Sequence, residues 1–104
     1  MVSVLEDKRA EDIVWLDVSE VTDLADIFLV ATLNNPRQMS AVSSECELER
    51  KRLGLPRVGV EGVSSSSSWV VLDYGDLVVH LFLPEQRDYY QLEHLWADAK
   101  RVPL

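Results

Sequence analysis

Two adjoining stretches decide the fold: DIFLVAT at residues 26–32 and NPRQMSAVSSECELERKRLGLP at residues 35–56. The first is a nearly continuous apolar run of strand length, which suits a central strand covered on both faces. In the second, Asn35 can cap a helix, Pro36 suits the first helical position, and Gln38 lies where a capping-box partner would. The sequence therefore predicts a buried strand that is followed at once by a helix.

The predicted helix has an apolar face and a charged face. The apolar face is formed by residues that recur at steps of three, four and seven: Met39, Val42, Cys46 and Leu53. Basic residues gather in the last turn, where they complement the helix dipole. Gly54 provides a left-handed exit, and Pro56 prevents the helix from continuing.

Working outward, the remaining elements complete a mixed sheet. We expect a short helix over residues 3–10, strands at Ile13–Val18, Arg57–Val60, Trp69–Leu72 and Leu77–Leu83, and one or two short helices within Glu85–Lys100. Ser3 and Glu6 have capping-box spacing. The order α-β-β-α-β-β-β-α predicts an α/β fold of the α+β type, with about five strands and helices packed on the sheet. A length of 104 residues predicts one domain over residues 1–104.

The charge balance indicates a protein partner. The chain has 18 acidic and 10 basic residues, a formal net charge of -8. Nucleic-acid binding depends on lysine and arginine neutralising phosphates, so we expect little direct contact with nucleic acid. Complementary charge would instead speed encounter with a basic protein surface.

The composition also predicts a cytoplasmic protein. A single cysteine cannot form an internal disulfide, which agrees with a reducing compartment. No apolar run approaches the ~20 residues that cross a membrane. The N-terminal MVSVLEDKRAED lacks the basic and apolar regions of a secretory signal.

No pattern for catalysis or for a cofactor is present. The phosphate-binding G-x-x-x-x-G-K-[ST] and G-x-G-x-x-G, the zinc motif H-E-x-x-H and the nucleophile elbow G-x-S-x-G are all missing. Asp73 and Asp76 could suggest a divalent metal, but a tight hairpin turn requires the same residue types. Cys46 is best interpreted as a small buried hydrophobe, and His80 as a hydrogen-bonded structural histidine. We therefore predict no catalytic residue, no metal and no cofactor.

Several segments, read in order, resemble one family. They are LDVSEVTDLADIFLVAT (16–32), the start of the central helix with Arg37, GVEG (59–62), WVVLDYGDLVVHLF (69–82) and PEQRDYYQLEHLW (84–96). The tandem of W-x-x-x-D-Y-G-D-x-x-x-H and R-x-Y-Y-x-L-E-x-L-W is the most specific part. The chain thus resembles the ribosome silencing factor family, also called Iojap-like. That resemblance extends from about Asp12 to Trp96.

The resemblance implies a fold and a non-enzymatic function. The fold would be similar to a nucleotidyltransferase-like domain without catalytic residues, often seen as a homodimer. Members bind the large-subunit ribosomal protein of the L-fourteen family, block joining of the small subunit and lower translation when nutrients are short. The residues that would build or support the docking face, by motif match, are Trp69, Leu72, Asp73, Tyr74, Gly75, Asp76, His80, Tyr90, Glu93 and Trp96.

Two alternatives stay open at this point. An adaptor for assembly of the large subunit would use the same face. A nucleotidyltransferase-like enzyme would need a Gly-Ser pair and an Asp-x-Asp or Glu-type metal pair. The chain has no Gly-Ser dipeptide, and Asp17 has no aspartate two positions away. The chain also departs from the family at Leu33–Gln38, where a small, Gly/Ser/Thr-rich segment and an Arg-His pair are usual.

Overall fold

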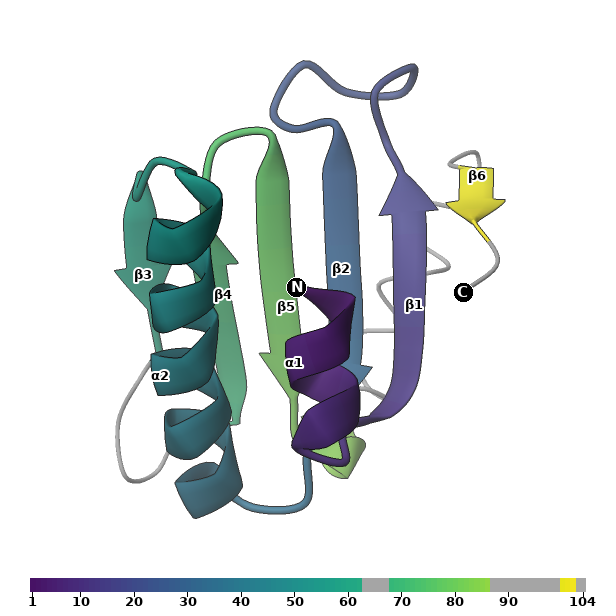
Figure 1. Ribbon diagram of the computed structural model, residues 1–104. Coiled ribbons are helices and arrows are strands. Elements are labelled where there is room, and N and C mark those ends of the chain that lie inside the picture. The colour runs from purple at the N-terminus through teal and green to yellow at the C-terminus, as the bar shows by residue number, and fades with distance from the viewer. Residues whose placement is uncertain (63–67, 87–99, 103–104) are drawn as a thin grey trace.

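The computed structural model describes residues 1–62, 68–86 and 100–102 (Figure 1). These residues form a six-stranded mixed sheet with two helices, α1 and α2, on one face. The elements are α1 (Val2–Asp7), β1 (Glu11–Asp17), β2 (Ile27–Thr32), α2 (Pro36–Leu53), β3 (Gly59–Glu61), β4 (Trp69–Asp73), β5 (Leu77–Phe82) and β6 (Lys100–Val102). The strand order is β3-β4-β5-β2-β1-β6. β2 and β5 run parallel, whereas β1–β2, β1–β6, β3–β4 and β4–β5 are antiparallel. The predicted α+β mixed sheet is confirmed.

Strand β2 has core residues on both of its faces, as its continuous apolar run predicted. Leu29 and Ala31 belong to the cluster that also contains Met39 and Val42 of α2. Phe28 and Val30 belong to a second cluster. Because successive side chains of a strand point to opposite faces, the two clusters lie on opposite sides of the sheet. Both helices cover the side that holds Leu29 and Ala31, so we call the cluster on that side the helix-side cluster (Figure 1).

The ends of α2 are those that the sequence predicted. The Asn35 side chain accepts a hydrogen bond from the Gln38 amide at 2.8 Å, and Pro36 occupies the first turn. The Gln38 side chain accepts, also at 2.8 Å, from the amide of Asn34, which lies one residue before the N-cap amide that a capping box would bind. Gly54 ends the helix in the left-handed conformation, with φ 73°.

The apolar face of α2 is shorter than predicted. Met39, Val42 and Cys46 are fully buried, but Leu53 is 46% exposed. Leu53 is the last residue of α2, and the chain turns back directly after it, where the Leu55 amide bonds to the Arg50 carbonyl. Leu55 packs against the core in place of Leu53.

Other expectations need correction at the edges of the fold. Helix α1 has Met1 as its N-cap and no side-chain cap, so the Ser3–Glu6 capping box is wrong. Strand β3 begins at Gly59, not at Arg57. Strand β6 is a sixth strand, beside β1, which the sequence did not predict. The helices expected within residues 85–100 fall mostly outside the described residues.

Candidate functional site

The turn between β4 and β5 is held by a side-chain hydrogen bond within the turn and by backbone hydrogen bonds to the end of β2. Asp73 accepts a hydrogen bond from the Gly75 amide through Oδ1 at 3.0 Å. Gly75 has a φ of +84°, and a Cβ added to it would lie 3.3 Å from Cγ of Pro56. The Asp76 carbonyl accepts from two amides of the β2 end, those of Asp26 and Ile27, at 2.9 Å each. The interpretation of Asp73 as a turn residue is confirmed by its hydrogen bond to the Gly75 amide. Glycine suits the positive φ of residue 75 because it has no Cβ.

The motif residues of this hairpin divide between the two faces of the sheet. Leu72 and Tyr74 are completely buried in the helix-side cluster. Trp69 and Val71 pack on the opposite cluster and stay partly accessible. We define the hairpin surface as five accessible residues: Trp69, Val71, Asp73, Gly75 and Asp76. Leu72 and Tyr74 cannot touch a partner without unfolding, so they support this surface from below.

An aromatic cluster around His80 underlies the hairpin surface. Trp69 donates from Nε1 to His80 Nδ1 at 3.3 Å and stacks on Phe82 with ring centroids 5.0 Å apart. Phe28 meets the His80 ring edge-on at 5.0 Å. Burial lowers the pKa of His80 from 6.5 to about 4, although the charge of Asp73 opposes this shift. His80 is therefore neutral at pH 7, and the prediction of a hydrogen-bonded structural histidine is confirmed.

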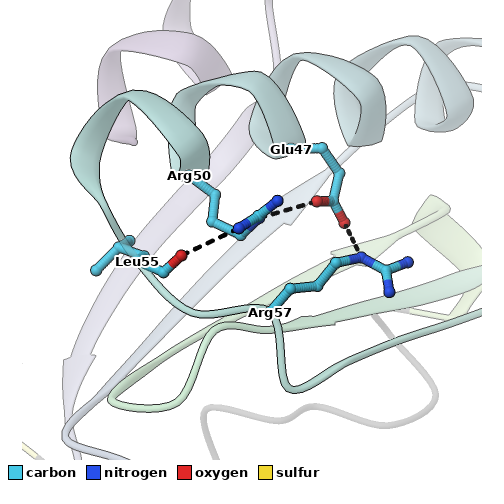
Figure 2. A network of polar contacts seen from close by, with 4 residues as sticks. All are labelled: Glu47, Arg50, Leu55 and Arg57. Atoms are coloured by element: carbon cyan, nitrogen blue, oxygen red, sulfur yellow. Dashed lines mark hydrogen bonds and ion pairs between the residues drawn. The ribbon is translucent and has the colours of Figure 1, made fainter.

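A polar network holds the loop that follows α2 (Figure 2). Glu47 pairs with Arg50 at 3.1 Å through one carboxylate oxygen and with Arg57 at 3.2 Å through the other. Arg50 also donates to the Leu55 carbonyl at 3.1 Å. The sequence placed Glu47 and Arg50 on a charged helix face, but their contacts to the loop depend on a tertiary arrangement that spacing does not reveal. The network thus holds in place the loop that connects α2 to β3.

A groove lies beside this loop on the sheet face opposite the helices. Its volume is about 350 Å³. It is lined by Val58, Gly59, Glu61, Val71 and Asp73. Four of these residues form neighbouring pairs on β3 and β4, where Gly59 lies opposite Asp73 and Glu61 opposite Val71. Sequence reasoning did not select Val58, Gly59, Glu61 or Val71 as site residues, although GVEG marked the segment.

The described residues offer little for catalysis. Burial raises the pKa of the Cys46 thiol to about 12, so the unreactive protonated form dominates at neutral pH. Within residues 1–62, 68–86 and 100–102, no group of three or more His, Cys, Asp or Glu could hold a metal ion. No helix in that part of the chain is long and apolar enough to cross a membrane. Tyr90, Glu93 and Trp96 lie outside it.

Comparisons with a family model, with named proteins and with solved structures agree with one another. The family model described as "Ribosomal silencing factor during starvation" matches residues 1–104. The ribosomal silencing factor RsfS of Chromobacterium violaceum is 41% identical over 99 residues, which cover 95% of this chain and 80% of that protein. A crystal structure of a protein from the same organism has a TM-score of 0.87 at 42% identity, covering 92% of this chain and 79% of that one. The mouse protein named "Mitochondrial assembly of ribosomal large subunit protein 1" is 32% identical over 100 residues, 93% of this chain and 43% of that protein.

Proposed function

We propose that this chain, which belongs to the family of ribosomal silencing factors, binds the large ribosomal subunit and prevents the small subunit from joining. The observation that carries the proposal is the family match over the whole chain, residues 1–104. Because the family consists of silencing factors and not of enzymes, the chain is a regulatory protein rather than a catalyst. Its expected effect is to lower translation when nutrients are short.

The partner in this proposal is the large-subunit ribosomal protein of the L-fourteen family, in the cytoplasm. A net charge of -8 supports a basic protein as partner, since opposite charge steers encounter. The proposed contact is the hairpin surface. Tryptophan is a frequent anchor of protein interfaces, and Trp69 is both held by His80 and partly accessible.

Exclusion by volume is a sufficient mechanism for this function. The chain measures 34 × 32 × 23 Å along its principal axes. A body of that size on the joining face of the large subunit would hold the small subunit away. No covalent step is needed, and the binding free energy must only compete with that of subunit association.

The first prediction concerns Asp76, an exposed residue of the hairpin surface. Asp76→Arg should leave the turn intact, because Asp76 bonds to the end of β2 through its backbone carbonyl, which the substitution keeps. We expect affinity for isolated large subunits to fall roughly tenfold or more, since like charge opposes docking. The measurement is co-sedimentation with large subunits over a range of protein concentrations.

A matched control for Asp76→Arg is Glu6→Arg. Glu6 is exposed on α1, on the helix side of the sheet, and the substitution has the same charge change. Affinity of this variant should equal that of the unmodified chain. Equal weakening by both substitutions would mean that net charge, and not the hairpin surface, governs binding.

A second candidate is an adaptor for assembly of the large subunit. The name of the mouse relative favours it, since that name refers to assembly of the mitochondrial large subunit. The same docking surface would serve both functions, which differ in the stage of the ribosome cycle at which the chain binds. Binding to immature particles in preference to mature subunits would favour the adaptor.

A homodimer remains a prediction from the family resemblance.

A further inference from the structure

We infer that the groove between β3 and β4 receives a lysine or arginine side chain of the partner protein. This inference rests on the proposed function, because it specifies the chemistry by which the large subunit is recognised. The groove adjoins the hairpin surface and shares Val71 and Asp73 with it. A partner seated on the hairpin would therefore lie over the groove.

The shape of the groove comes from a missing side chain. Gly59 lies directly opposite Asp73 across the antiparallel pair, and a Cβ built on it would meet nothing within 4 Å. Its φ lies outside the left-handed region, so the backbone at residue 59 does not itself require glycine. A hollow of about 350 Å³ remains, which is room for a long side chain.

The lining of the groove matches a cation on an apolar stem. Val58, which is 65% exposed, and Val71 offer surface for methylene groups. Glu61 and Asp73 offer carboxylates, and neither forms an ion pair with a described residue. Charge-assisted hydrogen bonds from a lysine or arginine would satisfy such carboxylates.

The neighbouring arginine is already engaged. Arg57 precedes Val58 in the chain, and its Nε is bound by Glu47, which also binds Arg50 (Figure 2). Among the described residues, no cation therefore pairs with Glu61 or Asp73, and the Asp73 carboxylate accepts only from the Gly75 amide, through Oδ1. A nucleic-acid phosphate would instead be repelled by them, so a basic side chain of a protein is the occupant we propose.

The first test fills the groove without changing its charge. Gly59→Val places a β-branched side chain in the open space beside Asp73, and valine is favoured in strands. The urea midpoint should be equal to or above that of the unmodified chain. Affinity for isolated large subunits should fall roughly tenfold or more, as expected when a partner's charged group can no longer reach its site.

The second test keeps the shape and removes the charge. The double variant Glu61→Gln with Asp73→Asn retains side-chain oxygens, including an acceptor for the Gly75 amide. We expect at least a tenfold loss of affinity here too, with Glu6→Gln on the opposite face as the matched control. Stronger binding by the double variant would mean that the groove faces phosphate, and unchanged affinity of either groove variant would also overturn the inference. If the unmodified chain fails to bind large subunits, the proposed function itself is at fault.

Discussion

Tyr74→Ala should lower the free energy of unfolding by about 3–5 kcal/mol, whereas Tyr74→Phe should leave it unchanged or raise it. Tyr74 is completely buried in the helix-side cluster, so truncation removes a large ring from a packed core. Its hydroxyl is buried without a hydrogen-bond partner among the described residues. Burial also raises the pKa of Tyr74 far above its ordinary value. Phenylalanine keeps the ring and removes an unsatisfied polar group.

Urea denaturation monitored by tryptophan fluorescence would measure both variants of Tyr74. A loss below about 1 kcal/mol for Tyr74→Ala would contradict full burial in the core. A loss of similar size for Tyr74→Phe would mean that the hydroxyl has a stabilising partner. Tyr74→Ala is therefore unsuitable for locating the docking contacts, because weaker binding would follow from unfolding alone.

A second large effect is expected at His80 as the pH falls. The pKa of His80 is about 4 in the folded chain and about 6.5 when the chain is unfolded. Between these values the unfolded state binds more protons, so stability decreases as the pH falls from about 6.5 to about 4. The maximum slope is about 1.4 kcal/mol per pH unit, with a total of roughly 3 kcal/mol. Protonation of Nδ1 would also turn this atom into a donor and break the hydrogen bond that it accepts from Trp69.

A control separates His80 from other groups that titrate in the same range. His80→Leu removes the imidazole while keeping an apolar side chain in the aromatic cluster. The difference in unfolding free energy between the unmodified chain and this variant should shift steadily against the unmodified chain from pH 6.5 to 4. A difference that stays constant over this range would mean that His80 is not the depressed group.

The elements that local sequence signals determine were predicted well. Asn35, Pro36 and Gly54 define the ends of α2 through their own conformational preferences and hydrogen bonds. Strand β2 was recognisable because a run buried on both faces has no polar alternation. In contrast, β6 is a three-residue strand that is defined by its pairing with β1, which no local pattern announces.

The candidate site could be predicted from the sequence only as a segment. The β4 residues alternate between faces, so Leu72 falls in the core while Asp73 lines the groove. Period-two alternation is a property of the sequence, and applying it to β4 would have separated these two roles. The contribution of Gly59 and Glu61 could not be anticipated in this way, because it depends on the register with which β3 pairs with β4.

Sedimentation of purified subunits through a sucrose gradient, with and without the chain, tests the central claim most directly. We expect the chain to migrate with the large subunit and the peak of joined ribosomes to decrease as its concentration rises. Asp76→Arg should restore that peak at a concentration where Glu6→Arg does not. If the chain migrates with neither subunit and the joined peak is unchanged, the proposal of a factor that blocks subunit joining is contradicted.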